Sequence, residues 1–188
     1  MAVAEPAFRV PVGANLLELV RGDITREETE AIANAANSAL AGGGGVDGAI
    51  HKAAGPDVMA ELRERYHGCP TGSAVITAAG RLKAKFILHA VGPKYSADPR
   101  DAELLESAYQ TCLILCEQHR IVSIAFHSIS TGIYGYPVGE AATVALKAVA
   151  DHLRKKEFPK LARFVLFDEE TLDVYHGAVH TVGLAHGH

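Results

Sequence analysis

A short polar and glycine-rich segment carries the residues of this chain that could do chemistry. It runs from Asn34 through Asn37 and Gly42–Gly45 to Asp47 and His51. Asp47 and His51 are four positions apart, which places both on one face of a helix. A carboxylate, an imidazole and two amides beside a phosphate can orient and activate a water molecule. Taken singly, Asp47 would be an ordinary acid at a helix N-terminus and His51 a structural histidine. The combination indicates chemistry.

The four glycines separate a predicted strand, which ends near Asn34, from a predicted helix that begins near Val46. Glycine lets the backbone approach a ligand closely and adopt positive φ. The helix start adds free N–H groups and the positive end of the helix dipole, which together suit a diphosphate. A flexible linker is the alternative, but a glycine run between a strand and a helix favours a functional loop.

Two familiar nucleotide motifs fit this segment poorly. No Gly-Lys-Ser/Thr follows the glycines, which excludes a P-loop. Gly43, Gly45 and Gly48 satisfy G-x-G-x-x-G literally, although any glycine run does so. The acidic residue expected about 20 positions later in a dinucleotide-binding fold would fall near His67 and Gly68, not at a strand end. The pattern therefore disfavours a dinucleotide-dependent dehydrogenase.

A second loop of small residues, 128–137, repeats the same design. It follows a predicted strand, contains Ser130, Thr131, Gly132 and Gly135, and leads into another predicted helix. Two such loops facing each other would hold a diphosphate from both sides. Tyr134 could cover a ribose with its ring, or it could be an ordinary loop aromatic.

Short apolar runs that alternate with helical patterns position both loops. The predicted strands are Asn15–Val20, Ala31–Ala35, Ser73–Thr77, Lys85–Val91, Ile121–His127 and Arg163–Phe167. The predicted helices are Val46–Ala54, Asp57–Tyr66, Asp101–His119, Val138–Lys155 and Glu170–Val179. This alternation predicts a three-layer α/β/α sandwich with ligands at the carboxyl ends of the strands. We expect one domain over 1–188, with a core at about 15–179, a short N-terminal extension and a loose tail from Thr181 that carries solvated histidines.

Composition narrows the classes of partner. The formal net charge is −4 and the basic residues are scattered, which disfavours RNA or another polyanion as the ligand. No basic segment followed by an apolar stretch opens the chain, and no apolar run approaches the ~18 residues of a membrane span. We therefore expect neither a signal peptide nor a membrane contact.

The three cysteines are Cys69, Cys112 and Cys116. Cys112, Cys116 and His119 could share a helix face and raise the question of a metal, but a fourth ligand is missing. Buried free cysteines are the favoured interpretation, in a reducing cytoplasm and with no metal or cofactor.

Many short motifs, taken together and in this order, resemble the macrodomain family, and most closely its MacroD-type branch. The motifs are Gly22-Asp23-Ile24-Thr25, the pair Asn34 and Asn37, the run Gly42–His51, Ala53–Pro56, Cys69–Gly72, His89–Pro93 and Ser130–Pro137. The resemblance covers roughly Val20 to Tyr175 and implies a mixed sheet between helices, with ADP-ribose bound at the strand ends.

The resemblance also implies roles for individual residues. Asp23 would accept a hydrogen bond from the adenine amino group, and the Ile24 backbone would help read the ring. The diphosphate would lie between two sets of residues, Gly44, Gly45 and Val46 on one side and Ser130, Thr131, Gly132, Ile133 and Tyr134 on the other. Asn37, Asp47 and His51 match positions that hydrolytic members use around the distal ribose, with Asn34 nearby. Those members cleave mono-ADP-ribose from acidic side chains and deacetylate O-acetyl-ADP-ribose, without a metal.

Two positions depart from the family pattern. Ala33 stands where valine is usual, which we interpret as a packing change. His127-Ser128 replaces the common Pro-Ala or Pro-Cys, and could either reshape the floor of the site or add a titratable group.

Three functions are compared on these residues. The leading hypothesis is hydrolysis of ADP-ribosyl esters, with Asp47 and the ligand's own phosphate orienting water, Asn37 holding the distal ribose and His51 supporting Asp47. A reader that binds ADP-ribose without turnover has no use for Asp47 opposite Asn37, so their joint presence favours the enzyme. Binding of RNA or poly-ADP-ribose is disfavoured by the acidic balance.

Overall fold

One seven-stranded sheet organises the chain. The computed structural model describes residues 6–184. The strands are β1 (Phe8–Val12), β2 (Asn15–Arg21), β3 (Ala31–Ala35), β4 (Ala74–Ala78), β5 (Phe86–Ala90), β6 (Ser123–Phe126) and β7 (Leu161–Leu166). Their order across the sheet is β1-β2-β7-β6-β3-β5-β4. The pairs from β2 to β5 are parallel, whereas β1 and β4 pair antiparallel at the two edges. The mixed sheet is therefore confirmed.

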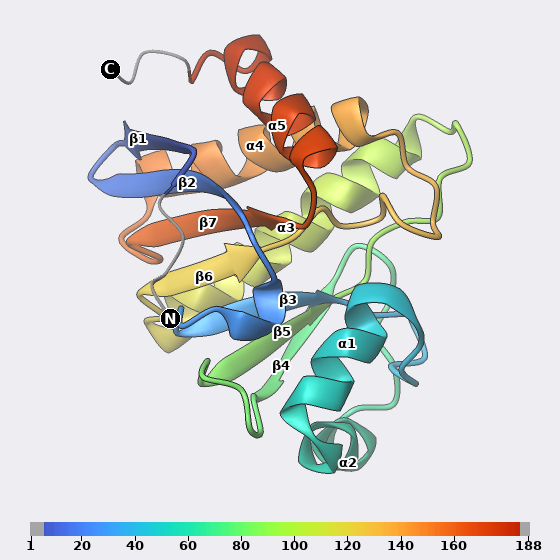
Figure 1. Cartoon of the computed structure of the whole chain (residues 1–188). Helices are drawn as coiled ribbons and strands as arrows, with labels where there is room; N and C mark the ends of the chain where they lie inside the picture. The colour runs from blue at the N-terminus through green and yellow to red at the C-terminus, as the bar shows by residue number, and fades with distance from the viewer. Residues whose placement is uncertain (1–5, 185–188) are drawn as a thin grey trace.

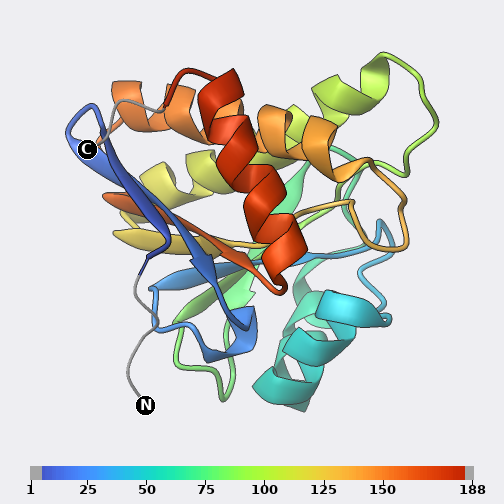
Figure 2. The same ribbon diagram turned by 45° about the horizontal axis from the view of Figure 1, so that its top comes forward.

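Helices cover both faces of the sheet, so the predicted three layers are confirmed (Figures 1 and 2). The helices are α1 (Gly45–Ala54), α2 (Pro56–Arg65), α3 (Arg100–His119), α4 (Val138–Lys155) and α5 (Glu169–Thr181), with a short 3-10 turn η1 (Ile24–Arg26). Helices α3, α4 and α5 share one apolar cluster with the sheet. Helices α1 and α2 share the other, which includes Ile32, Ile50 and Val58. Every helix and strand predicted from the sequence is present, with ends that differ by at most a few residues.

The N-terminal extension contains an edge strand that the sequence analysis missed. In β1, Val10 and Val12 are buried while Arg9 and Pro11 are exposed, the alternation of a half-buried strand. Pro11 is tolerated because an edge strand does not need every N–H. The turn at Gly13, where φ is +63°, folds β1 back onto β2.

Residues 181–184, which the sequence analysis assigned to a loose tail, continue α5 and pack on the core. Helix α5 continues to Thr181, and the Leu184 amide donates to the Val179 carbonyl at 2.9 Å. Leu184 is buried in the larger apolar cluster. His186 and His188, expected to be solvated, lie outside the described residues.

A buried ion-pair network joins three neighbouring strands at one end of the sheet order. Glu18 on β2 is fully buried, and its two carboxylate oxygens accept from Arg9 on β1 and Arg163 on β7, each at 2.8 Å from the guanidinium Nε. Arg163 also donates to Glu27 at 2.9 Å.

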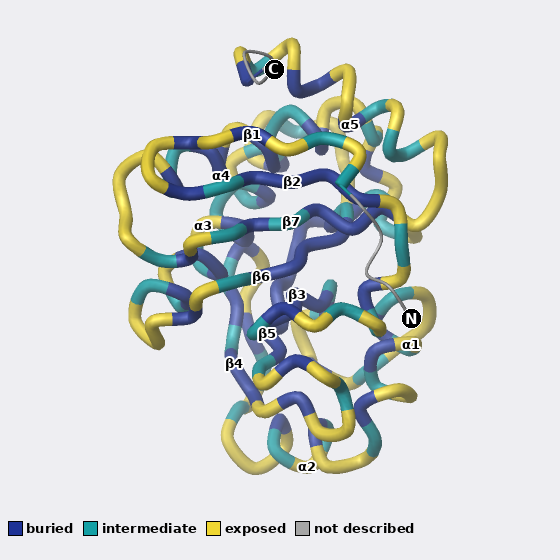
Figure 3. Tube along the Cα trace, turned by 60° about the vertical axis from the view of Figure 1, so that its left-hand side comes forward, coloured by how far each residue is buried: buried dark blue, intermediate teal, exposed yellow. Residues whose placement is uncertain are grey.

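Figure 3 shows the inner strands buried along most of their length and the connecting loops exposed.

The cysteines belong to the apolar core, as the sequence analysis favoured. Cys112 and Cys116 on α3 are fully buried, and burial raises the pKa of both thiols. His119 is exposed at the end of the same helix, so it does not lie with them. Among residues 6–184 no group of three or more metal-ligating side chains is close enough to hold an ion. No helix in that range is both long and apolar enough to cross a membrane.

Candidate active site

The two glycine-containing loops lie at the same edge of the sheet. One follows β3 and leads into α1, and the other follows β6 and leads into α4. Because β3 and β6 are adjacent and parallel, their carboxyl ends lie at one edge of the sheet, and both ribbon views place the two loops at that edge (Figures 1 and 2). The sequence prediction of two facing loops agrees with this arrangement.

The backbone of both loops is open to a ligand. A Cβ atom added at Gly44, Gly45 or Gly132 would meet no atom within 4 Å. The N-cap residues of α1 and α4 are Gly44 and Pro137, and neither gives a side-chain hydrogen bond to its helix. The first N–H groups of these helices are therefore free to bind an anion.

Gly48 has a different role from the open glycines. A Cβ there would lie 2.6 Å from the Gly43 carbonyl oxygen, so only glycine lets the loop fold back onto the first turn of α1. This contact explains the third glycine of the literal G-x-G-x-x-G match by packing.

Asp47 is the centre of the polar contacts at the start of α1. Its Oδ1 accepts a hydrogen bond from Asn34 Nδ2 at 2.8 Å and lies 3.3 Å from His51 Nε2. Burial raises the pKa of Asp47, but hydrogen bonds from His51 and Asn34 outweigh it and hold the pKa below its ordinary value. The structure thus brings together three of the predicted residues around an ionised carboxylate.

The second oxygen of Asp47 faces the glycine loop. A Cβ atom on Gly43 would lie 3.5 Å from Asp47 Oδ2 and 4.0 Å from Asn37 Nδ2. Asn37 and Asp47 therefore reach the same point of the backbone from two sides. Asn37 also closes its own loop, because its Oδ1 accepts from the Ala41 amide at 3.0 Å and its Nδ2 donates to the Gly42 carbonyl at 2.9 Å.

His89 on β5 extends the contacts behind Asp47. The ring is fully buried, its Nδ1 lies 3.2 Å from Asn34 Nδ2, and its Nε2 lies 2.9 Å from Thr77 Oγ1. The ring also stacks on His51 at a centroid distance of 5.9 Å. Burial, with a contribution from His51, lowers the pKa of His89 to about 3, so the ring is neutral at physiological pH. The sequence analysis named His89 only within the motif His89–Pro93 and did not anticipate these contacts.

His127, which departs from the family pattern, is a buried neutral histidine directly after β6. It is 8% exposed, and burial lowers its pKa to about 4 against the opposing charge of Asp47. Its Nε2 has no hydrogen-bond partner among the described residues. The Tyr109 hydroxyl donates to its carbonyl at 3.2 Å and so fixes its backbone.

The loop after β6 places its predicted residues unevenly. Ser130 is buried at a φ of +69°, whereas Ile133 is 89% exposed. Thr131 Oγ1 donates to the Ser128 carbonyl at 3.0 Å, which turns the loop. The Tyr134 ring is half-buried, with Lys94 Nζ 5.6 Å from its centroid. Tyr134 is thus anchored to the neighbouring loop, and Ile133 projects freely.

Asp23 lies directly after β2 at the same edge of the sheet. Its Oδ1 accepts from the Thr25 amide at 2.9 Å and from Thr25 Oγ1 at 2.7 Å, which caps η1. Ile24 is buried, so its backbone rather than its side chain is the part available to a ligand.

Phe167 is a candidate binding residue that the sequence analysis did not select. It is 79% exposed immediately after β7, and the Gly22 amide donates to the Leu166 carbonyl beside it at 3.0 Å. An exposed ring at the same edge of the sheet as Asp23 offers a stacking surface. The available signal was an aromatic residue at the last position of the predicted strand, directly before Asp168, the N-cap of α5.

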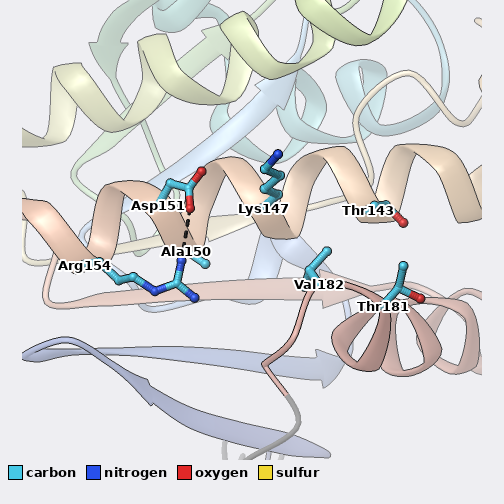
Figure 4. A pocket seen from close by; sticks show the side chains of 7 residues that line it. All are labelled: Thr143, Lys147, Ala150, Asp151, Arg154, Thr181 and Val182. Carbon is cyan, nitrogen blue, oxygen red and sulfur yellow. Dashed lines mark hydrogen bonds and ion pairs between the residues drawn. The ribbon is translucent and has the colours of Figure 1, made fainter.

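A separate hollow lies between α4 and the end of α5 (Figure 4). Its lining residues are Thr143, Lys147, Ala150, Asp151, Arg154, Thr181 and Val182. Asp151 and Arg154 pair with each other at 3.0 Å. None of the predicted site residues takes part in it.

Comparison with known proteins agrees with the geometry. A protein of Salmonella gallinarum named O-acetyl-ADP-ribose deacetylase is 50% identical over 163 residues, which is 85% of this chain and 91% of that protein. A macro domain-containing protein of Caldanaerobacter subterraneus is 52% identical over 85% of this chain and 93% of its own length.

Solved structures give the same result. A variant of the Oceanobacillus iheyensis macrodomain with ADPR superposes with a TM-score of 0.89 at 41% identity, over 93% of this chain and 97% of that one. The Trypanosoma brucei macrodomain in complex with ADP-ribose gives a TM-score of 0.85 at 35% identity, over 94% of this chain and 74% of that one. The family model for the Macro domain matches residues 33–145. With its sheet, loops and relatives in agreement, this chain belongs to the macrodomain family.

Proposed function

We propose that this protein binds ADP-ribose across the two loops and hydrolyses its esters, with O-acetyl-ADP-ribose and mono-ADP-ribosyl esters of acidic side chains as substrates. The relatives named O-acetyl-ADP-ribose deacetylase support the first substrate. The macrodomain solved with ADP-ribose supports the ligand. Protein-linked esters share the same ADP-ribose group, so mono-ADP-ribosylated proteins are part of this proposal.

The observation that carries the proposal is that the two carboxylate oxygens of Asp47 have different surroundings. Oδ1 is held by Asn34 and His51, while Oδ2 faces the glycine loop beside Asn37. Binding a diphosphate needs only backbone amides and gains nothing from a fixed carboxylate nearby, because the two anions repel each other. A carboxylate placed there against this cost is suited to orienting water.

In the proposed reaction, water attacks the acyl carbon of O-acetyl-ADP-ribose. In the protein-linked ester it attacks either the acyl carbon or the anomeric carbon of the distal ribose. The ester bond breaks, the water proton is taken up at Asp47 Oδ2 or at the ligand's phosphate, and it returns to the leaving oxygen. An Asp whose pKa is lowered is a weak base, so the phosphate shares this task. Asn37 holds the distal ribose, and His51 supports Asp47.

The binding part of the proposal assigns each remaining residue. Asp23 and the Ile24 backbone contact the adenine, and Phe167 stacks near it. Gly44, Gly45 and Val46 face the diphosphate from α1. The loop from Ser130 to Tyr134 faces it from the other side. The reducing cytoplasm is the proposed location, since all three cysteines are free.

The experiment incubates the purified protein with O-acetyl-ADP-ribose and, separately, with a glutamate-ADP-ribosylated protein in water labelled with ¹⁸O. We expect ADP-ribose to be released from both. Label in the released acid indicates attack at the acyl carbon, and an unlabelled acid released from the glutamate ester indicates attack at the anomeric carbon. Tight binding of ADP-ribose with no product from either substrate would reject the enzyme in favour of a reader.

A further inference from the structure

A continuous line of side chains runs from β4 to α1 behind the proposed active site. Thr77, His89 and Asn34 are all buried, and they connect in that order to Asp47. Asn34 and His89 face each other in register on the neighbouring parallel strands β3 and β5. The line therefore belongs to the rigid sheet and not to the loops.

The contacts fix the proton on the His89 ring. Asn34 Nδ2 is a donor and lies 3.2 Å from His89 Nδ1, so a neutral ring must accept at Nδ1. The ring then carries its hydrogen on Nε2 and donates it to Thr77 Oγ1 at 2.9 Å. Thr77 in turn donates its own hydroxyl hydrogen to the Ala78 carbonyl at 2.8 Å. Each donated hydrogen in the line then has one acceptor, and only this tautomer of His89 satisfies all of these contacts.

The orientation of the Asn34 amide follows from the same contacts. Its nitrogen serves both Asp47 Oδ1, at 2.8 Å, and His89 Nδ1, at 3.2 Å. Its oxygen is buried without a partner. A flipped amide would place that oxygen against the Asp47 carboxylate, and the opposite His89 tautomer would demand such a flip.

We infer that His89, with its tautomer held by Thr77, is a positioning residue that acts through Asn34 to fix the Asp47 carboxylate. Asp47 Oδ1 is thereby occupied, and Oδ2 is left to face Gly43 and Asn37. The inference rests on the proposed function only where turnover is its readout. The titratable groups facing Asp47 are His51 on its own helix, His89 on β5 and His127 after β6.

Two variants of nearly equal shape test the inference. His89→Leu removes the acceptor for Asn34, whereas His89→Asn keeps an oxygen close to the Nδ1 position. Loss of the charge-assisted hydrogen bond from Asn34 to Asp47 corresponds to about 10- to 150-fold in rate, and we expect His89→Leu to lower turnover of O-acetyl-ADP-ribose by up to that factor. ADP-ribose affinity should stay within about twofold, because the backbone loops carry binding. His89→Asn should recover most of the lost rate.

Two measurements on the free protein are independent of turnover. Nitrogen NMR of the wild-type ring should show His89 neutral with its hydrogen on Nε2, and Thr77→Val should introduce the other tautomer. Carbon NMR should show the pKa of the Asp47 carboxyl rising in His89→Leu and staying in place in His89→Asn.

Equal rate losses in the Leu and Asn variants, or an Nδ1 hydrogen in the wild type, would overturn the inference. If the wild type hydrolyses neither ester, the proposed function fails, while the two NMR measurements still decide the role of His89.

Discussion

At the scale of single residues, the site separates groups that bind from groups that position. Asn34 holds Oδ1 of Asp47, whereas Oδ2 faces the glycine loop. The amide oxygen and nitrogen of Asn37 both form hydrogen bonds within its own loop. A substitution at Asn37 would therefore alter loop shape as well as any contact to a ribose. Asp47 is the cleaner probe of chemistry, and Asp23 is the cleaner probe of binding.

The variant Asp47→Asn keeps the shape of the side chain and removes the charge. We expect turnover of O-acetyl-ADP-ribose to fall by about 10²–10⁴-fold, the usual loss of a positioned acid–base group. ADP-ribose affinity should change far less, since no part of the backbone contact depends on the carboxylate. Single-turnover kinetics and calorimetry on one preparation check both statements. A variant that turns over at the wild-type rate would remove Asp47 from the mechanism.

The variant Asp23→Asn preserves the cap on η1, because an amide oxygen can still accept from Thr25. Its nitrogen replaces the free carboxylate oxygen and opposes the adenine amino group. A charge-assisted hydrogen bond is worth about 1.5–3 kcal/mol, so ADP-ribose should bind roughly 10- to 150-fold more weakly. Ribose-5-phosphate, which lacks adenine, should bind both proteins equally. Equal calorimetric affinity for ADP-ribose would place the adenine elsewhere.

At the scale of elements, the site is a meeting of two strand-to-helix connections. The loops after β3 and β6 bring the starts of α1 and α4 to one edge of the sheet because the two strands are parallel neighbours. Tyr109 and Tyr175 tie the second connection to α3 and α5, through the backbone at residues 127 and 129 and the Ser128 hydroxyl. The loops thus present backbone amides from a fixed base.

Gly132→Glu tests whether the second loop holds the diphosphate. The added side chain meets open space in the free protein, so we expect the fold and its melting temperature to survive. ADP-ribose binding should be lost, because a carboxylate would occupy and repel the phosphate site.

A matched control is Gly177→Glu on α5, another exposed glycine whose added Cβ meets nothing within 4 Å. It should bind ADP-ribose as the wild type does. Retained binding in Gly132→Glu would instead place the diphosphate away from this loop.

At the scale of the whole molecule, the candidate site places two histidines in the buried interior, where they affect the stability of the fold. His89 and His127 have pKa values of about 3 and 4 in the folded protein, against an ordinary value of 6.5. Both must stay neutral for the native packing to persist. Protonation of either histidine in the folded protein therefore lowers the free energy of unfolding of the whole domain.

This predicts how the free energy of unfolding depends on pH. Below about pH 6.5 the unfolded chain binds a proton at each histidine while the folded protein does not, until pH falls to about 4 for His127 and 3 for His89. Stability should therefore fall as pH is lowered through this window, by up to about 1.4 kcal/mol per pH unit for each histidine. Urea unfolding at several pH values measures the slope.

His127→Leu should reduce the dependence of the free energy of unfolding on pH between about pH 4 and 6.5, because one of the two buried histidines is removed. His180→Leu, at an exposed position, is the control and should follow the wild type. Parallel slopes in the wild type and His127→Leu would mean that His127 titrates normally.

The sequence by itself determined the layers and brought most residues of the candidate site to attention. Short apolar runs and amphipathic helical patterns report local burial directly, so the helices and six of the strands were predictable from periodicity. The glycine run and the Asp47–His51 spacing are local in the chain, and their neighbours in the fold are the ones that spacing implies.

Only the tertiary structure decided which distant side chains meet. The hydrogen bonds from Asn34 to His89 and from His89 to Thr77 depend on the order and register of β3, β5 and β4, which no local pattern encodes. Strand β1 is likewise explained only by its pairing with β2, because a five-residue edge strand has too little periodicity of its own. The same holds for Phe167, whose place at the same edge of the sheet as Asp23 follows from the pairing of β7 with β2.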